Sequence, residues 1–297
     1  MRINKPNFLY IGPDKAGSTW LFDVLSEHPE CYVPACKDIY FFDKYYHFGI
    51  GWYLRFFKRA SVSVPAVGEF SHDYLFSTLA ADRIKNDLPG VKMMTTLRNP
   101  VERTFSHYLH WVSRGWTEHP FEMALKMYPE LIEHSLYFKH LSEYFKRFDS
   151  SQIKIFLFDK LQKNPKEFIS EVFHFLGVSF VGNTRIHEKS MQSSRPRSPF
   201  LIRNARRCAN IIRGMGMPDL VGYIKHSSLA NMLYKTYTPE ERPRLDNETR
   251  HSLVKTFRTD ILKLQDLIST DLSHWLDDEN EFDVYSKVHI KKQLRVN

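Results

Sequence analysis

Short apolar runs alternate with amphipathic stretches along the first 180 residues of the chain. The apolar runs predict four strands, at residues 7–11, 66–69, 91–97 and 153–158. A helical pattern follows each run within a few residues, and residues 18–27 after the first strand show it most clearly. Strands that alternate with helices predict an α/β fold, in which a parallel β-sheet is flanked by helices on both faces.

Three short sequences predict the N-termini of helices. Asn99-Pro100-Val101-Glu102 and Asn164-Pro165-Lys166-Glu167 each offer a capping side chain, proline at the first helical position and Glu at the third. Thr238-Pro239-Glu240-Glu241 is a close variant. An apolar stripe predicts a further long helix over about residues 247–268.

Residues 180–200 have little periodicity and several basic side chains, so they predict a long surface loop. Long loops in compact domains are often functional. No linker divides the chain cleanly, and one domain over residues 1–297 is therefore predicted.

Composition and charge narrow the classes of function. Hydrophobic residues make up 42% of the 297 residues and charged residues 26%, as in ordinary globular proteins. The net charge of +8 favours anionic partners, but the basic residues are dispersed and form no recognisable nucleic-acid module. No apolar stretch is long enough to predict a transmembrane segment. Three cysteines are too few for a disulfide framework, so reduced thiols and a cytoplasmic location are expected.

The segment from Gly12 to Thr19 joins the first strand to the first helix. A loop in this position presents backbone N–H groups and the positive end of a helix to an anion. Gly12 and Gly17 have the spacing of a nucleoside-triphosphate P-loop, but Ser18 stands where that motif has lysine, and the lysine lies inside the loop as Lys15. The sequence thus predicts a P-loop-like phosphate site.

A second cationic position follows the third predicted strand. Arg98 lies at the end of that strand, where a kinase would need a carboxylate for Mg²⁺, and Ser106 falls two turns into the next helix. Ligands bind at the carboxyl ends of strands in open α/β sheets. Two anion sites at neighbouring strand ends are suited to a nucleotide with phosphates on both its 5′ and 3′ sides, bound without a metal.

Several segments in order resemble the sulfotransferases that use 3′-phosphoadenosine 5′-phosphosulfate (PAPS). These segments are GPDKAGSTWL, KDIYFFD, GWYLRFF, GEFSHDYLF and LRNPVERTFSHY, followed by IKIFLFDKLQKNPKEFISEVFHFLGV. The chain is most similar to the heparan-sulfate and related glycan sulfotransferases and their bacterial relatives. The resemblance covers most of the chain and implies the sulfotransferase fold.

The resemblance also implies which residues bind PAPS. The 5′-phosphosulfate would lie on Lys15, Ala16, Gly17, Ser18, Thr19 and Trp20. Arg98 and Ser106 would hold the 3′-phosphate. Arg195 and Arg197, in the predicted late loop, would close over the cofactor.

Asp38 is the candidate catalytic base, because it stands where the glycan sulfotransferases have a glutamate before a Phe-Phe pair. An alcohol acceptor loses its proton during transfer, and a carboxylate or histidine within hydrogen-bond reach can take it. Asp is one methylene shorter than Glu, so Glu69 and His72 are the alternatives. Phe70 and His72 replace the family's usual lysine and proline, which puts a close copy of heparan recognition in doubt.

The predicted activity is transfer of a sulfuryl group from PAPS to a hydroxyl or amine, with a saccharide as the first candidate for the acceptor. A small-molecule acceptor is the other possibility, and either kind can be anionic. A metal-dependent nucleotide kinase or NTPase and a non-catalytic nucleotide- or glycan-binding protein are the alternative functions.

Overall fold

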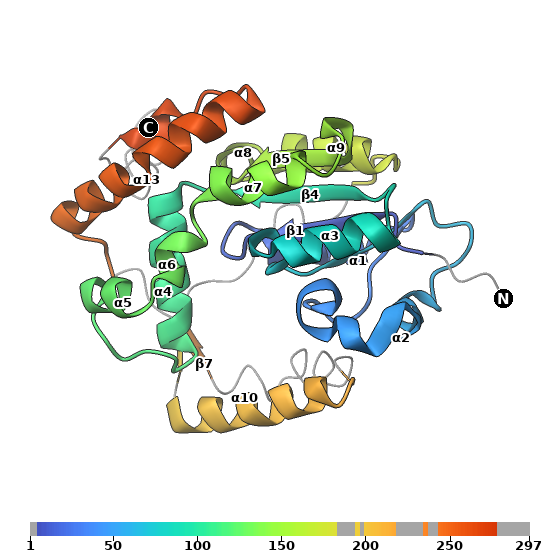
Figure 1. Cartoon of the computed structure of the whole chain (residues 1–297), viewed down its shortest axis with the longest axis horizontal. Helices are drawn as coiled ribbons and strands as arrows, with labels where there is room; N and C mark the ends of the chain where they lie inside the picture. Colours follow the sequence, from blue (N-terminus) through green and yellow to red (C-terminus); the bar gives the residue numbers. More distant parts are fainter. Residues whose placement is uncertain (1–4, 183–193, 197–198, 218–233, 237–242, 278–297) are drawn as a thin grey trace, which may run out of the picture.

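The central sheet has five parallel strands in the order β2-β3-β1-β4-β5. The computed structural model describes residues 5–182, 194–196, 199–217, 234–236 and 243–277 (Figure 1). The strands are β1 (Phe8–Gly12), β2 (Cys31–Tyr32), β3 (Ala66–Phe70), β4 (Lys92–Leu97) and β5 (Ile153–Leu157). All four predicted strands are confirmed. The fifth, β2, escaped the sequence pattern because two residues are too few to show alternation.

Helices cover both faces of the sheet, as the α/β prediction requires. Phe8 and Tyr10 of β1 pack on one face with residues of α1 (Ser18–Ser26) and α9 (Pro165–Leu176). Leu9 and Ile11 point to the other face, into a core that they share with α3 (Thr78–Asp87), α7 (Tyr137–Phe145) and α13 (Asn247–Ile268). Side chains alternate across a strand, so a strand buried on both faces must be apolar throughout.

The two Asn-Pro sequences begin helices where they were predicted. The Asn99 side chain accepts hydrogen bonds from the backbone N–H of Val101 and Glu102 at the start of α4 (Pro100–Ser113). Asn164 caps α9 in the same way, through the N–H of Glu167. The bounds of α13 agree with the predicted range, whereas Thr238-Pro239 lies outside the described residues.

The predicted loop over residues 180–200 is wrong in its last part. Ser194–Pro196 form strand β6, which pairs antiparallel with β7 (Tyr234–Thr236) and lies against α4. Helix α10 (Pro199–Gly214) follows, at the lower edge of Figure 1 and on the opposite side of the molecule from α13. Its last residue precedes a turn at Gly216, whose carbonyl accepts hydrogen bonds from Arg55 and from Trp52 Nε1.

The remaining helical segments are short and join the larger elements. They are η1 (Phe41–Tyr45), η2 (Tyr46–Phe48), α2 (Gly49–Leu54), η3 (Arg55–Phe57), η4 (Tyr74–Phe76), α5 (Phe121–Met127), α6 (Glu130–Glu133), η5 (Ser150–Gln152), α8 (Phe158–Lys163) and η7 (Ser273–Leu276). Within the described ranges, no helix has the length and apolar character needed to cross a bilayer. The single domain over residues 1–297 stays a prediction.

The strand order places three loops together at one edge of the sheet. β1 lies between β3 and β4, and all three strands are parallel. Their carboxyl ends therefore meet at the same edge, where the chain continues into the glycine-containing loop after β1, into Ser71-His72 after β3 and into Arg98 after β4. Such an edge, with crossovers leaving in both directions, is where open α/β sheets bind ligands.

Candidate active site

The loop of residues 12–17, here called the glycine loop, is fixed by buried donors from the sheet and from α4. The Tyr10 hydroxyl donates to the Pro13 carbonyl over 3.2 Å, and the Thr95 hydroxyl donates to the Gly12 carbonyl. Arg103, fully buried on α4, forms an ion pair with the Asp14 carboxylate and donates to the Asp14 carbonyl. The loop is therefore held before any ligand binds, and the charge of Asp14 is neutralised.

The N-terminus of α1 follows the glycine loop. Gly17 has φ 88°, in the left-handed region, and a Cβ there would lie 2.7 Å from Leu161 Cδ2, so glycine is strongly favoured. The first helical hydrogen bond joins the Leu21 N–H to the Gly17 carbonyl. The N–H groups of the preceding turn thus belong to the positive end of the helix.

Two predicted residues of this segment have buried side chains. Trp20 packs against Phe168 with ring centroids 6.0 Å apart, and Ala16 is fully buried. Because these two side chains are buried in the protein, the loop can offer a ligand only its backbone at Ala16 and Trp20. The groups available to an anion here are therefore backbone N–H groups, the Ser18 and Thr19 hydroxyls and Lys15.

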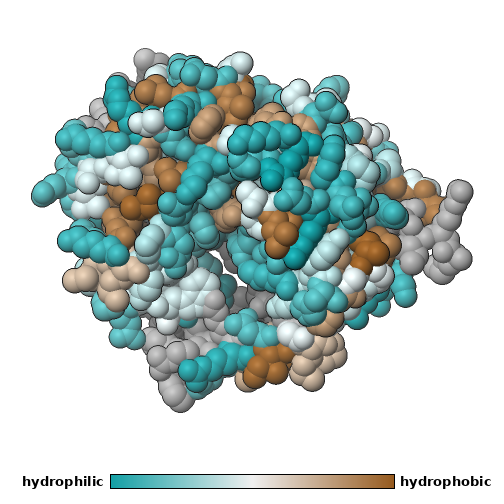
Figure 2. All heavy atoms as spheres, in the orientation of Figure 1, coloured by the Kyte–Doolittle hydropathy of each residue, from teal (hydrophilic) through white to brown (hydrophobic). Residues whose placement is uncertain are grey.

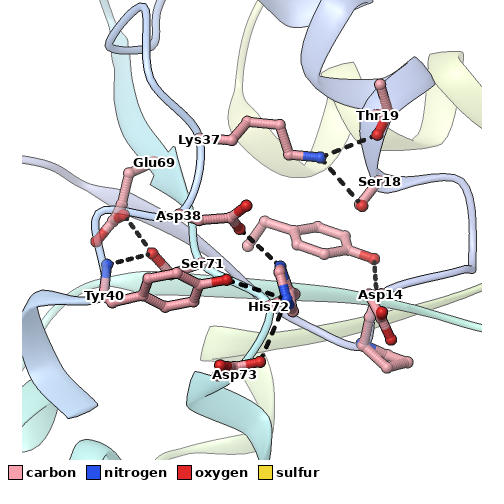
Figure 3. A network of polar contacts seen from close by, with 12 residues as sticks. Asp14, Ser18, Thr19, Lys37, Asp38, Tyr40, Glu69, Ser71, His72 and Asp73 are labelled. Atoms are coloured by element: carbon pink, nitrogen blue, oxygen red, sulfur yellow. Dashed lines mark hydrogen bonds and ion pairs between the residues drawn. The ribbon is translucent and has the colours of Figure 1, made fainter. Parts of the chain in front are cut away.

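Lys15 is partly buried in the glycine loop, with φ 65°. Burial lowers the pKa of Lys15 to about 8, with Arg98 and Arg114 adding to the effect and Asp14 opposing it. A second lysine, Lys37, reaches the first turn of α1 from another loop. Lys37 Nζ lies 3.2 Å from both the Ser18 and Thr19 hydroxyl oxygens, and Figure 3 shows its side chain reaching the first turn of α1.

Arg98 is buried at the end of β4, as predicted, and it has partners that the sequence did not reveal. Its guanidinium lies over the Phe158 ring, and Nη2 is 3.6 Å from Glu102 Oε2. Glu102 also binds the buried guanidinium of Arg250 from α13. Ser106 is half-buried one helical turn beyond Glu102, so it lies on the same face of α4.

Asp38 and His72, which the sequence offered as alternative bases, form one hydrogen-bonded pair. Asp38 Oδ1 lies 2.6 Å from His72 Nδ1 (Figure 3). His72 Nε2 lies 3.1 Å from the Tyr40 hydroxyl and 3.2 Å from Asp73 Oδ1. Burial disfavours the charged imidazole, but the carboxylates of Asp38 and Asp73 outweigh it and raise the pKa of His72 to about 9.

Glu69, the third candidate base, occupies a different environment. It is buried inside the sheet edge and accepts hydrogen bonds from the hydroxyls of Tyr53, Tyr74 and Ser71, over 3.0, 2.8 and 2.8 Å. Burial raises the pKa of Glu69 to about 7, although these hydroxyls oppose the shift. A carboxyl enclosed by its own chain cannot reach an acceptor, so this geometry speaks against Glu69 as the base.

The partners of Glu69 instead hold the Asp38 segment. The Ser71 hydroxyl accepts from the backbone N–H of Tyr40, and the Tyr74 hydroxyl accepts from the N–H of Phe41. Asp38 itself donates its N–H to the Phe70 carbonyl over 2.7 Å. We therefore interpret Glu69 as a positioning residue that fixes the backbone beside Asp38.

The predicted late-loop arginines are only partly described. Arg195 lies in β6, paired with Lys235 of β7, and β6 lies against α4, the helix that bears Ser106. Arg197 lies outside the described residues. Their closure over the cofactor stays a prediction.

No three His, Cys, Asp or Glu side chains are grouped as a metal site in the part of the chain that the structure describes. Metal independence stays a prediction, based on Arg98 standing where a kinase would have an acidic ligand. The sequence also missed Lys37 as a site residue, although it is the immediate neighbour of Asp38 in the segment that revealed the candidate base.

Comparisons with known proteins agree with this fold. A family model for the sulfotransferase domain matches residues 5–232. The crystal structure of a sulfotransferase from Alicyclobacillus acidocaldarius superposes with a TM-score of 0.68 at 25% identity, covering 93% of this chain and 100% of that one.

Two curated relatives are longer proteins. The membrane-associated sulfotransferase kil1 of Dictyostelium discoideum is 32% identical over 136 residues, which are 43% of this chain and 29% of that protein. Bifunctional heparan sulfate N-deacetylase/N-sulfotransferase 4 of Mus musculus is 31% identical over 198 residues, 59% of this chain and 22% of that protein. The chain thus spans less than a third of the length of these relatives.

The positioning role of Glu69 predicts a loss of stability rather than a specific loss of chemistry. Glu69→Gln places an amide NH₂ among three hydroxyl donors, and we expect the free energy of unfolding to fall by about 1–3 kcal/mol. Tyr53→Phe, which removes one donor, is expected to cost about 1 kcal/mol. Chemical denaturation measures both. A Glu69→Gln protein of unchanged stability and abolished activity would instead identify Glu69 as the base.

Proposed function

Because this chain belongs to the sulfotransferase family, we propose that it transfers the sulfuryl group of PAPS to an acceptor hydroxyl or amine and releases 3′-phosphoadenosine 5′-phosphate (PAP). The observation that carries the proposal is the pair of cationic sites at neighbouring strand ends. One is the glycine loop with Lys15 and the α1 N-terminus, and the other is Arg98, whose partner Glu102 lies on the same face of α4 as Ser106. A nucleotide with phosphates at both its 5′ and 3′ positions fits such a pair.

The 5′-phosphosulfate binds the glycine loop in this proposal. The amides of the first turn of α1 and the Ser18 and Thr19 hydroxyls donate to its oxygens. The 3′-phosphate takes a place on Arg98, whose guanidinium Glu102 already orients, and on the Ser106 hydroxyl. Arg98 is buried, so its interaction with a phosphate is poorly screened by water.

The transfer step exchanges one oxygen–sulfur bond for another. The acceptor oxygen or nitrogen forms a bond to sulfur, the bond from sulfur to the 5′-phosphate oxygen breaks, and PAP leaves with the bonding electron pair. Negative charge therefore grows on the leaving phosphate, where Lys15 stabilises it more strongly in the transition state than in the ground state.

The acceptor proton goes to the Asp38–His72 pair. The pKa of His72 is raised to about 9, so the imidazole is protonated at neutral pH and cannot itself accept a proton. We propose that Asp38 is the base and that His72 holds its carboxylate in place through the 2.6 Å contact. Tyr40 and Asp73 fix the other side of the imidazole.

A saccharide is the acceptor that we favour. The heparan sulfate enzymes among the relatives support this choice, and the net charge of +8 suits an anionic glycan. Membership of the sulfotransferase family leaves the kinase alternative without support. The cytoplasmic location stays a prediction.

The proposed donor site predicts a strong preference for PAP over AMP. The 3′-phosphate adds about two charge-assisted hydrogen bonds, worth ~3–6 kcal/mol in binding free energy. Arg98→Ala should remove most of this preference and leave the fold intact, because Glu102 keeps Arg250 as a partner. Titration calorimetry compares the two ligands. Arg147→Ala is the control, because it loses contacts only with Asp82 and Glu143 among the described residues, away from the site.

Equal affinities for PAP and AMP would refute the assignment of Arg98. Sulfuryl transfer is measured from the intact mass of candidate acceptors. Tight binding of PAP without transfer to any acceptor would favour the non-catalytic alternative.

The pKa of Lys15 predicts weaker binding of PAP at alkaline pH. A lysine whose pKa is lowered to about 8 is cationic below that pH and neutral above it. The affinity should fall about tenfold between pH 7 and pH 9. In Lys15→Arg the charge persists, so the fall should be smaller. Identical pH profiles for the two proteins would show that Lys15 does not titrate in this range.

The base is tested by substitution combined with a pH profile. Asp38→Asn keeps size and polarity but removes proton affinity, and we expect kcat to fall ~10²–10⁴-fold with PAP affinity unchanged. With Asp38 as the base, kcat of the native protein should not rise between about pH 6 and pH 8, and it should begin to fall near pH 8 as Lys15 loses its proton.

Neutral His72 as the base would give a different result. The rate would then rise about tenfold per pH unit up to about pH 9, and His72→Asn would lose more activity than Asp38→Asn.

A further inference from the structure

We propose that Lys37 binds the transferring sulfuryl group itself, and so acts as a second catalytic cation that is distinct from Lys15. This inference rests on the proposed sulfuryl transfer and assigns a residue to one part of the donor. The observation behind it is the place of the Lys37 ammonium, between the first turn of α1 and the segment that bears Asp38.

The Lys37 side chain crosses from one side of the site to the other. Its backbone precedes Asp38, but Nζ lies 3.2 Å from Ser18 Oγ and 3.2 Å from Thr19 Oγ1 (Figure 3). Both hydroxyls accept from Lys37, so each can turn its own O–H toward a bound anion. The ammonium thus shares the first turn of α1 with the anion proposed to bind there.

The surroundings of Lys37 leave its charge poorly compensated. Nζ lies 5.8 Å from the centroid of the Phe22 ring and 5.9 Å from that of Phe70. Among the described residues, no carboxylate oxygen lies within 4.0 Å of it. Burial lowers the pKa of Lys37, while the more distant Asp38, Asp23 and Asp14 favour its charged form. A partly buried cation of this kind gains more from an incoming anion than a solvated one does.

The position of Lys37 points to the sulfuryl group rather than to the phosphates. Lys15 belongs to the loop after β1 and Arg98 follows β4, whereas Lys37 reaches α1 from the segment that contains the proposed base. The sulfuryl group must lie between its 5′-phosphate and the acceptor that Asp38 deprotonates. A cation that joins the Asp38 segment to the anion site lies on that path.

The backbone around Lys37 is held firmly enough to place such a cation. The Asp38 N–H donates to the Phe70 carbonyl, and the Ser71 and Tyr74 hydroxyls, which bind Glu69, accept from the N–H groups of Tyr40 and Phe41. Lys37 would neutralise the sulfuryl oxygens as the group moves, without forming or breaking a covalent bond to them.

Lys37→Met tests the proposal, because methionine keeps the unbranched apolar stem of the side chain and removes the ammonium group. PAP has no sulfuryl group, so its affinity in calorimetry should change less than threefold. In single-turnover assays with PAPS, the rate should fall by ~10²-fold. Lys37→Arg keeps the charge and should recover part of the rate. Lys85→Met is a matched control, since Lys85 lies on α3, outside the site, with its ammonium over the Phe148 ring.

The remaining outcomes all contradict the assignment. A native rate in Lys37→Met would show that the ammonium does not act on the sulfuryl group. A parallel loss of PAP affinity and rate would place Lys37 on the 5′-phosphate. A native protein that binds PAP but transfers no sulfuryl group would refute the proposed function, whereas transfer by the native protein with no effect in Lys37→Met refutes only the role of Lys37.

Discussion

The site depends on the contact between two backbone segments, at Gly12 and at His72. Gly12 has φ 127°, and a Cβ at this position would overlap the His72 carbonyl oxygen. Glycine alone allows the loop after β1 to lie directly against the loop after β3. That contact brings the anion-binding loop and the Asp38–His72 pair into one place, and parallel pairing of β1 with β4 adds Arg98 from the other side.

Cations dominate this edge of the sheet, and the chain neutralises only some of them. Asp14 compensates Arg103, while Glu102 lies between Arg98 and Arg250. Lys15 and Lys37 have weaker compensation and correspondingly lowered pKa values. Figure 2 shows hydrophilic side chains over much of the surface in view. An anionic donor would restore the balance of charge at the strand ends.

The sequence was informative where a short pattern has one structural solution. Asn99-Pro100 and Asn164-Pro165 fixed helix starts because cap and proline occupy adjacent, defined positions. Contacts between distant segments were harder to predict. Three hydroxyls enclose Glu69, and the Lys37 side chain reaches α1. Both contacts depend on how loops fold back on the sheet, which the local periodicity of the sequence does not predict. Pro199 is the first residue of α10 and is typical of a helix N-terminus, but the sequence analysis assigned it to the loop because the residues before it show little periodicity.

A crystal structure of the protein with PAP bound tests the central claim most directly. The account predicts the 5′-phosphate within hydrogen-bond distance of Lys15 and the backbone amides at the start of α1. It predicts the 3′-phosphate on Arg98 and Ser106, and Lys37 pointing to the side of the 5′-phosphate that faces Asp38. A nucleotide bound elsewhere, or one whose 3′-phosphate lies in solvent while Arg98 contacts only Glu102, would contradict it.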